Sequence, residues 1–359
     1  MILHVFNPEH DIAFAQNKVN FTAPQAARNM RKDVGFIPAL WAKDGDCVLV
    51  EDVVYAKKAF DIFACRLTDA GLGYPAGDIV FASHASLSSL PIDGVDVWGW
   101  DTAVKNELER YGVNGEILPD FNELEVVRQL SHRATAAGIL DLFYLPDTVG
   151  QAFVCATERE VYDCILRLSN VVLKAPWSCS GRGLRFVSPS EITPHIKGWI
   201  KNIIGTQGSV VVEPYYDKVC DFGMEFFCSK CGEITYEGLS LFSTVHGTYT
   251  GNTIATENFK NSAVTRYVSE MLLDDIKEKL RCECGKAFRG RYRGFFGVDM
   301  MVVRDTDAGK YKVHPCVEIN LRRTMGHVAL ALSRHACETT RAVLNIEKNN
   351  NYQLKLNLI

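Results

Sequence analysis

The spacing of hydrophobic residues divides the chain into an N-terminal part of alternating strands and helices and a later part rich in antiparallel hairpins. In residues 1–115, short apolar runs alternate with stretches of helical periodicity. Strands are predicted at 1–6, 46–50 and 79–82, and helices at 24–31, 53–66 and 101–111. This alternation is typical of a small, largely parallel α/β domain.

The remaining residues predict two α+β subdomains, at 116–215 with two linker helices and at 216–359 with a C-terminal helix. The expected strands are 151–155, 171–174, 209–213, 220–228, 233–242, 295–303 and 311–320. The expected helices are 123–130, 132–142, 157–168, 190–204, 262–281 and a last one from Met325 to about Val343. The final residues are expected to lie on the surface or to fray.

Polar side chains interrupt the two C-terminal strands. Asp299 lies inside the first run, and Glu318 and Asn320 end the second. Side chains alternate along a strand, so Glu318, Asn320 and Arg322 project from one face. A carboxylate among apolar residues is costly unless something compensates it, and oxygen ligands from neighbouring strands suit Mg²⁺. A pair of solvated or salt-bridged acids is the alternative.

A lysine and a Ser/Gly loop end another apolar strand. Lys174 interrupts the run VVLK, and the following loop contains Ser178, Ser180, Gly181 and Gly183. Backbone N–H groups in loops of this composition can approach a phosphate, and a lysine supplies a point charge. The order of residues is not that of a P-loop. A simple hairpin turn is the alternative, and the lysine within the strand favours the phosphate site.

Two further stretches are candidates for ligand contacts. Glu213, Pro214 and Tyr215 end the strand at 209–213, because proline cannot donate a hydrogen bond to a sheet. Residues 246–252, HGTYTGN, are predicted to be a polar loop that closes over a site.

The first strand ends at the sequence NPEHD, residues 7–11. Open α/β sheets bind ligands beyond the carboxyl ends of their strands, so Asn7 and His10 are candidates for orienting a polar substrate. A turn followed by a helix cap is the alternative. Trp98 and Trp100 could stack a ligand, although tryptophans so placed are more often packing residues.

The composition excludes some classes of protein. A net charge of −4 over 359 residues provides no basic excess for a nucleic-acid backbone, and no polybasic run is present for anionic lipid. The first residues lack the basic region of a signal peptide, and no apolar run reaches membrane-spanning length. We therefore expect a cytoplasmic protein that binds neither nucleic acid nor membrane, with its twelve cysteines reduced.

Four of the cysteines form two pairs, Cys228 with Cys231 and Cys282 with Cys284. The spacing is poor for zinc, because one residue separates the second pair where roughly two to four are usual. Residues 229–232 also look like a hairpin turn between two strands. We expect no zinc here.

The order of these motifs resembles the ATP-grasp superfamily from about residue 115 to residue 345, and the domain before it resembles the usual N-terminal partner. VVLKAPWSCSGRGL is similar to the strand lysine and the flexible glycine-rich loop over the triphosphate. VVVEPYY is similar to the hinge strand that holds adenine. GVDMMVV and CVEINLRR are similar to the two metal-binding strands.

The resemblance implies a nucleotide site. Lys174 would contact the ATP phosphates beneath the glycine-rich loop, and Glu213 with the backbone that follows it would take the adenine. The family usually has a lysine at a helix start, where the sequence SHRATAAG offers Arg133 as a phosphate contact. Asp221 would bind the ribose, with Asp217 as the competing residue.

The resemblance also implies magnesium-dependent phosphoryl chemistry. Asp299, Glu318 and Asn320 would hold one or two Mg²⁺ or Mn²⁺ ions, and Arg322 would steady the transferring phosphoryl group. Positive charge around a γ-phosphate is most of what phosphoryl transfer requires. The expected protein is a ligase that joins a carboxylate to an amine or a thiol through an acylphosphate.

The substrate is expected between the domains, beside Asn7 and His10. Arg293, with Arg322 or Arg323, could hold its carboxylate in a two-pronged fit, and the loop containing His246 would exclude water. Two alternatives remain: a phosphotransferase on the same fold and a non-catalytic nucleotide-binding protein. A homodimer also remains open.

Overall fold

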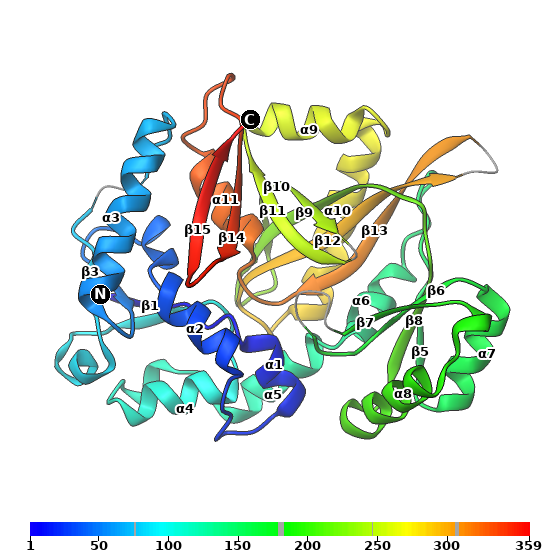
Figure 1. Cartoon of the computed structure of the whole chain (residues 1–359), viewed down its shortest axis with the longest axis horizontal. Helices are drawn as coiled ribbons and strands as arrows, with labels where there is room; N and C mark the ends of the chain where they lie inside the picture. Colours follow the sequence, from blue (N-terminus) through cyan, green and yellow to red (C-terminus); the bar gives the residue numbers. More distant parts are fainter. Residues whose placement is uncertain (75–76, 179–182, 246, 306–308) are drawn as a thin grey trace.

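The computed structural model describes residues 1–74, 77–178, 183–245, 247–305 and 309–359. Within these residues, three sheets are formed from three consecutive parts of the chain (Figure 1). The N-terminal sheet and a small four-stranded sheet lie on opposite sides of a large seven-stranded sheet.

The N-terminal sheet has four parallel strands in the order β3-β2-β1-β4, which confirms the predicted parallel α/β architecture. Its strands are β1 (Ile2–Val5), β2 (Cys47–Leu49), β3 (Val80–Ala82) and β4 (Gly94–Val97). The helices around it are α1 (His10–Gln16), α2 (Gln25–Val34), α3 (Val53–Asp69) and α4 (Thr102–Arg110), with short 3₁₀ helices at Ile37–Leu40, His84–Ser89 and Gly115–Ile117. Leu3 and Val48 are fully buried, as expected for strands covered on both faces. The sequence did not predict β4.

The small sheet is antiparallel, in the order β5-β8-β6-β7. Helices α5 (Phe121–Leu130) and α6 (Arg133–Leu140) lead to it from the N-terminal sheet. It contains β5 (Phe153–Cys155), β6 (Val171–Lys174), β7 (Leu184–Val187) and β8 (Val210–Pro214), with α7 (Glu158–Leu168), the 3₁₀ helix Pro189–Glu191 and α8 (Pro194–Gln207). Its core is separate from the others, because Val161 of α7 and Ile200 of α8 pack on Leu173 of β6.

The central sheet is antiparallel, in the order β13-β12-β9-β10-β11-β14-β15. Its strands are β9 (Lys218–Cys228), β10 (Ile234–Val245), β11 (Thr248–Ile254), β12 (Gly294–Asp305), β13 (Lys310–Asn320), β14 (Ala342–Lys348) and β15 (Tyr352–Leu358). The helices of this region are α9 (Glu257–Thr265), α10 (Glu270–Phe288) and α11 (Met325–Ser333). The predicted hairpins β9–β10 and β12–β13 are both confirmed.

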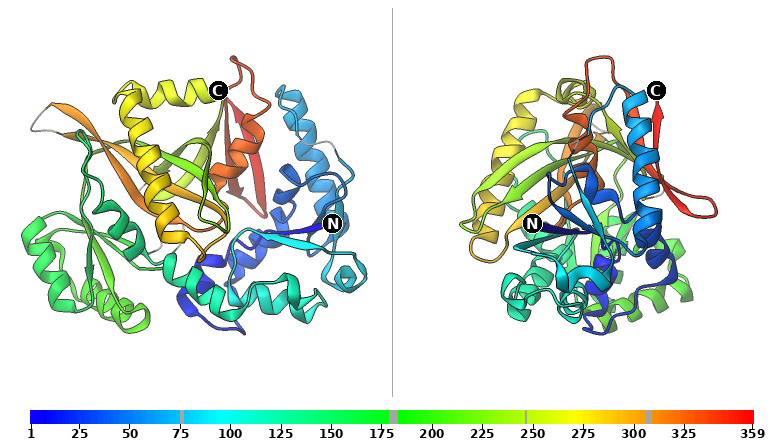
Figure 2. Two further views of the ribbon diagram at one scale, coloured as in Figure 1. Left: turned by 180° about the vertical axis from the view of Figure 1, so that it is seen from behind. Right: turned by 90° about the vertical axis from the view of Figure 1, so that its left-hand side faces the viewer.

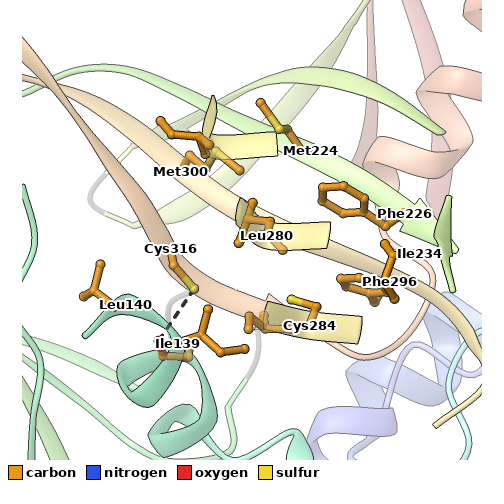
Figure 3. Packing of buried hydrophobic residues seen from close by; sticks show 14 of the residues in the cluster. Ile139, Leu140, Met224, Phe226, Ile234, Leu280, Cys284, Phe296, Met300 and Cys316 are labelled. Atoms are coloured by element: carbon orange, nitrogen blue, oxygen red, sulfur yellow. Dashed lines mark hydrogen bonds between the residues drawn. The ribbon is translucent and has the colours of Figure 1, made fainter. Parts of the chain in front are cut away.

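The two faces of the central sheet differ: one packs in a hydrophobic core, and the other is only partly covered. Phe226 and Phe296 pack against Leu280 of α10 in the largest hydrophobic core (Figure 3). Because side chains alternate along a strand, Asp299 projects from the other face. Part of that second face is covered by α11, whose Val328 packs with residues of the N-terminal helices. The rest of it is available to form a site.

Two predictions for the C-terminal end are wrong. The last helix ends at Ser333 rather than near Val343, and β14 then pairs with β11. The final residues are not frayed, because β15 pairs with β14 along its length and Leu354 is 4% exposed. The alternation in YQLKLNL is the pattern of a half-buried strand, which its position near the end of the sequence obscured.

Two other elements also differ from their predictions. Residues 262–281 are not one helix, because Ser269 caps a separate helix α10 by accepting a hydrogen bond from the N–H of Leu272 at 3.2 Å. The predicted polar loop at 246–252 is largely strand β11, which pairs with β10 and β14. Its tyrosine and threonines favour a strand. His246 itself lies outside the described residues.

Candidate active site

The residues predicted to bind nucleotide and metal surround one cavity of about 580 Å³. Its walls come from β6, β7 and β8 of the small sheet and from β9, β10, β12 and β13 of the central sheet. Lys174, Glu213, Asp299 and Glu318 all line it. The volume is in the range of small-molecule sites.

The two acidic residues predicted to bind metal stand opposite each other, because β12 and β13 pair with Asp299 in register with Glu318. Like charges in this position repel each other. Burial and the Glu318 carboxylate raise the pKa of Asp299 to about 7. The amide of Asn320 donates to Asp299 Oδ2 at 3.1 Å. This set of oxygen donors fits a divalent cation, which would compensate the repulsion between the two carboxylates.

A bulge shapes the cavity beside these acids. The register of β12 and β13 shifts after Asp299, because β13 contains extra residues around Pro315. Proline cannot donate a hydrogen bond to a neighbouring strand, and bulges are frequent next to active sites. Lys174 Nζ donates to the carbonyl of Val317, in the bulge, at 3.3 Å.

Both cations predicted to bind phosphate are paired with carboxylates of the same site. Lys174 Nζ lies 2.6 Å from Glu213 Oε1, and both side chains are buried. An Nη atom of Arg133 lies 2.8 Å from Glu318 Oε1. The structure thus brings together all four residues, and it places each cation against an acid that the sequence assigned to adenine or metal.

The glycine-rich loop begins and ends beside Arg133. The guanidinium of Arg133 donates to Ser178 Oγ at 3.4 Å, and the carbonyl of Gly183 accepts from the N–H of Ala175 at 2.9 Å. A Cβ atom on Gly183 would lie 2.3 Å from that of Ser178, so only glycine fits there. The predicted phosphate contacts Ser180 and Gly181 lie outside the described residues.

An apolar slot forms part of the cavity, and the ring centroids of its Phe186 and of the hinge residue Tyr215 lie 5.9 Å apart. The residues that form its walls are Val172, Leu184, Phe186, Phe242 and Met301. The N–H of Tyr215 already donates to the carbonyl of Asn170 at 2.9 Å, so this N–H is not free for a ligand. A planar base would therefore be recognised mainly by packing against the slot.

Asp221 is better placed than Asp217 to bind a ribose. Asp221 lines the cavity and accepts hydrogen bonds from Lys218 Nζ at 2.5 Å and from Thr244 Oγ1 at 2.7 Å. Asp217 is outside the lining and forms an exposed ion pair with Arg304 at 3.5 Å. The sequence analysis missed Lys218 and Thr244, although Lys218 stands only three residues from Asp221.

His314 is a buried residue that the sequence analysis also missed. It is fully buried, and its Nε2 lies 4.0 Å from Glu213 Oε2. Its ring packs in a T-shaped arrangement against the ring of Tyr216, with 5.5 Å between the two ring centroids. Burial and the charge of Lys174 lower the pKa of His314 to about 3, so the ring is neutral. Because the His314 ring carries no charge, the charge of Glu213 is balanced by Lys174 and not by His314.

The tip of the β10–β11 hairpin meets the small sheet across the cavity. Gly247 lines the cavity, and a Cβ atom on it would lie 2.8 Å from Leu184 of β7. The stretch predicted to close over the site is therefore at its edge, but as part of a hairpin rather than as a loop.

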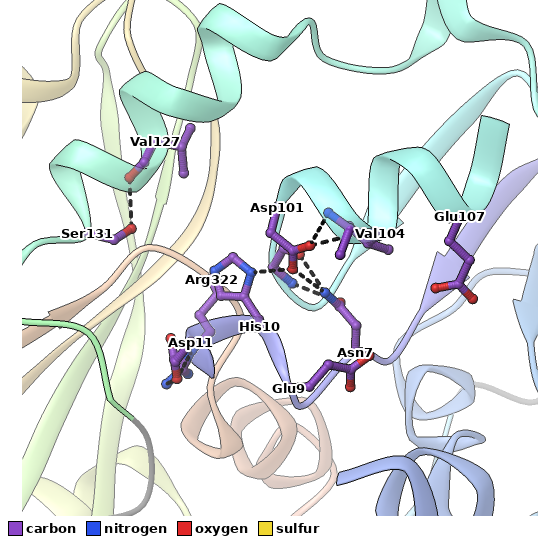
Figure 4. A network of polar contacts seen from close by, with 12 residues as sticks. Asn7, Glu9, His10, Asp11, Asp101, Val104, Glu107, Val127, Ser131 and Arg322 are labelled. Atoms are coloured by element: carbon purple, nitrogen blue, oxygen red, sulfur yellow. Dashed lines mark hydrogen bonds and ion pairs between the residues drawn. The ribbon is translucent and has the colours of Figure 1, made fainter. Parts of the chain in front are cut away.

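The NPEHD stretch holds the N-terminal helices in place (Figure 4). Asn7 Nδ2 donates to the carbonyl of Gly99 at 2.8 Å, and His10 Nδ1 lies 3.0 Å from Asp101 Oδ2. Asn7 and His10 are each 1% exposed, and neither is among the residues that line the cavity with Lys174 and Asp299. Direct contact of these two residues with a substrate stays a prediction, and their bonds favour the turn-and-cap alternative.

Arg322 joins the N-terminal part to the metal pair. Asp11 accepts hydrogen bonds from two nitrogens of the guanidinium, the shorter at 2.8 Å, and Asn320 Oδ1 accepts another at 2.9 Å. The Asp11 carboxylate raises the pKa of Arg322 against the effect of burial, and Arg322 lowers the pKa of Asp11. Asn320 thus links Asp299 on one side to Arg322 on the other.

Arg293 lines a second cavity of about 580 Å³, between β4 and the start of β12, together with Arg322 and Arg323. Asn7 and His10 lie side by side, because both bond Asp101 Oδ2, but neither of them lines this second cavity.

The cysteines lie in two different environments. Cys228 and Cys284 are buried, whereas Cys231 and Cys282 are exposed. Across the described ranges, no group of three or more His, Cys, Asp or Glu residues could hold a metal ion. The predicted turn after Cys228 is confirmed, because the N–H of Ser229 donates to the carbonyl of Glu233 at 2.9 Å. The absence of zinc stays a prediction that elemental analysis of the purified protein tests.

Among the helices of the described chain, none has the length and apolarity needed to cross a bilayer.

No protein-family model matches the sequence, and no curated protein is similar to it in sequence. The structure is similar to the biotin carboxylase domain of 2-oxoglutarate carboxylase from Hydrogenobacter thermophilus, with a TM-score of 0.52, 10% identity, and coverage of 96% of this chain and 74% of that chain. It is also similar to pyruvate carboxylase from Rhizobium etli, with a TM-score of 0.51, 15% identity, and coverage of 92% of this chain and 27% of that chain. The chain therefore has the ATP-grasp fold of these proteins.

Proposed function

We propose that this protein is an ATP- and Mg²⁺-dependent ligase that joins a carboxylate to an amine or a thiol through an acylphosphate. One observation carries the proposal: on an ATP-grasp fold, two opposed carboxylates and two cations converge on a single cavity. The similar structure from Hydrogenobacter thermophilus contains MgADP and bicarbonate, which supports a nucleotide and a small carboxylate as ligands.

Different residues of the chain contact the base, the ribose and the phosphates of the nucleotide. The apolar slot receives the base, Asp221 accepts from the ribose, and Lys174 and Arg133 donate to the phosphates. Asp299 and Glu318 would hold Mg²⁺ with Asn320 beside them, and the ion, when bound, neutralises part of the charge on the phosphates.

Nucleotide binding requires an exchange of partners. Lys174 is paired with Glu213, and Arg133 with Glu318. When the phosphates take the two cations, Glu213 becomes free for the adenine and Glu318 becomes free for the metal. Binding of nucleotide and of Mg²⁺ should therefore be cooperative, because each releases a residue that the other uses.

Arg322 is the residue that we assign to the transferring phosphoryl group. Its guanidinium is already oriented by Asp11 and Asn320, so little freedom is lost when it donates to a phosphate oxygen. An arginine so placed stabilises negative charge that develops during transfer.

The test is ATP turnover with panels of carboxylates, each offered alone and together with an amine or a thiol. The ligase proposal expects ADP release that depends on both substrates, and a condensation product by mass spectrometry. Stable phosphorylated product from one substrate alone would instead identify a phosphotransferase. Tight nucleotide binding without ADP from any panel would identify a non-catalytic protein. Glu318→Gln is the control for contaminating ATPase, because it should lose the activity.

Three further features belong to the proposal. The three sheets support a division at 1–115, 116–215 and 216–359, which limited proteolysis tests. A cytoplasmic location stays a prediction, which fractionation of the source cells tests. The neighbour from Hydrogenobacter thermophilus is a domain dimer, which supports a homodimer here, and light scattering tests it.

A further inference from the structure

The second cavity lies along the edge of the N-terminal sheet. One wall is β4 with residues 98–100, and the other is formed by residues 292–295 with Phe227. Strand β4 is at the end of its sheet, so this edge has no neighbouring strand in the described structure. The cavity shares none of its described lining residues with the first one, although Arg322 of its lining also bonds Asn320 beside the metal pair. Its volume of about 580 Å³ suits a small molecule.

Aromatic rings form much of its lining. Phe227 and Phe295 pack edge to face, with 4.9 Å between their ring centroids. The Cζ atom of the Arg323 guanidinium lies 3.7 Å from the ring centroid of Phe295. Trp100 lines the opposite wall. Trp100, Phe227 and Phe295 are each only partly buried, so a ring inserted among them would remove apolar surface from water.

Among the described residues of the lining, one cation has no charged partner. Arg323 is paired with Asp96 at 2.7 Å, and Arg322 with Asp11 at 2.8 Å. Asp93, the other acid of the lining, is paired with the amino group of Met1. Arg293 is exposed and has no ion-pair or hydrogen-bond partner in the described part of the chain. The cavity therefore presents an unpaired guanidinium at the edge of an aromatic surface.

Trp100 provides a second donor. Its indole N–H has no hydrogen-bond partner among the residues that the structure describes, whereas the indole of Trp41 donates to Asp96 at 3.3 Å. This N–H is not among the buried unpartnered polar atoms, so it is open to water and available to an acceptor on a ligand.

We propose that this cavity binds an aromatic carboxylate. The ring packs among Trp100, Phe227 and Phe295, and the carboxylate accepts a two-pronged hydrogen bond from Arg293. An aliphatic carboxylate lacks the surface for the aromatic wall, and a neutral aromatic amide lacks the charge for Arg293. Both should bind more weakly than a molecule that combines the two features.

Titration calorimetry with 2-naphthoate as the probe tests this, using the full chain without nucleotide. The wild-type protein should bind the probe with a Kd of roughly 1 mM or tighter. Arg293→Gln should weaken binding about tenfold. Arg291→Gln is the matched control: Arg291 is also exposed, lies two residues away and is outside the lining, so binding should be unchanged.

Two further probes separate the contributions. Cyclohexanecarboxylate and 2-naphthamide should each bind at least tenfold more weakly than 2-naphthoate to the wild-type protein. The proposal is overturned if naphthoate does not bind, if naphthamide binds equally well, or if Arg293→Gln binds like the wild type. Because no nucleotide is present, these outcomes are independent of the ligase proposal, which stands or fails on ATP turnover.

Discussion

The two cations of the proposed nucleotide site, Lys174 and Arg133, are each paired with a carboxylate. Lys174 and Glu213 are 5% and 6% exposed, so neither charge is solvated by water and each depends on the other. Such a pair is costly to break from one side, because the remaining charge stays buried. The residues that would serve a ligand therefore also contribute to folding, and a substitution at one of them has two effects.

Lys174→Met should abolish nucleotide binding and lower stability together. Removing one partner of a buried ion pair costs about 3–5 kcal/mol, so the melting temperature should fall by several degrees. The double variant Lys174→Met with Glu213→Gln should recover much of this stability, because it leaves no buried charge. Differential scanning fluorimetry measures the melting temperature, and calorimetry with an ATP analogue measures binding.

The double variant is the control for folding in this experiment. It should remain unable to bind nucleotide even where its melting temperature approaches that of the wild type. If the stable double variant did bind nucleotide, Lys174 would not be a phosphate-binding residue.

Asp299→Asn should stabilise the protein above neutral pH when Mg²⁺ is absent. The folded pKa of Asp299 is raised to about 7 by burial and Glu318, so the folded state holds a proton that the unfolded chain releases at lower pH. The free energy of unfolding therefore falls as pH rises between the unfolded pKa, roughly 4, and about 7. The amide does not titrate, so the variant avoids this loss.

The expected gain is roughly 1 kcal/mol at pH 8, shrinking towards pH 5. Urea titrations at the two pH values measure it, with Asp217→Asn as the control because Asp217 is exposed. A gain that is equal at both pH values, or a loss at pH 8, would contradict the environment described for Asp299.

At the scale of elements, alternation along strands predicted most of the site. Asp299, Glu318, Lys174 and Glu213 were placed on strands by sequence pattern and assigned to one site by the resemblance, and they line one cavity. The bulge at Pro315 could not be predicted, because a local pattern shows that a strand is interrupted but not how its partner adjusts. The walls of the apolar slot were also missed, since apolar strand residues look alike whether they face a core or a ligand.

The C-terminal strand shows a second limit of local pattern. β15 was taken for a surface-lying or frayed tail because most of its partner β14 was assigned to the same tail, and an edge strand is recognised only beside the strand it pairs with. Its inward residues join the core under α2 and α3, where Leu354 packs with Leu344. The strand is thus part of the folded unit.

Leu354→Ala should destabilise the protein by about 2–5 kcal/mol, as expected for a leucine truncated inside a core. Leu358→Ala provides a matched control on the same strand, because Leu358 is 65% exposed and should change stability by less than about 0.5 kcal/mol. Urea denaturation measures both. If the two variants were equally stable, the conclusion that β15 packs in the core would be wrong.

At the scale of the whole molecule, contacts distant in sequence join the N-terminal sheet to the end of β13. The N–H of Arg323 donates to the carbonyl of Trp98 at 2.8 Å, and Asp11 holds Arg322. The left-hand view of Figure 2 shows the N-terminal strands beside the lower end of α10, and Figure 1 shows the small sheet on the other side. Such contacts between distant segments are not visible in a local pattern. The expected grouping of Arg293 with Arg322 or Arg323 is nevertheless consistent with the structure, because all three line one cavity.

Mg²⁺ and ATP are proposed to bind together in the cavity between the small sheet and the central sheet. Calorimetry with a non-hydrolysable ATP analogue tests this proposal most directly, with and without Mg²⁺, on the wild type and on Glu318→Gln. Mg²⁺ should tighten analogue binding at least tenfold in the wild type, and Glu318→Gln should lose this enhancement. No analogue binding, or an equal effect of Mg²⁺ on both proteins, would contradict the proposal.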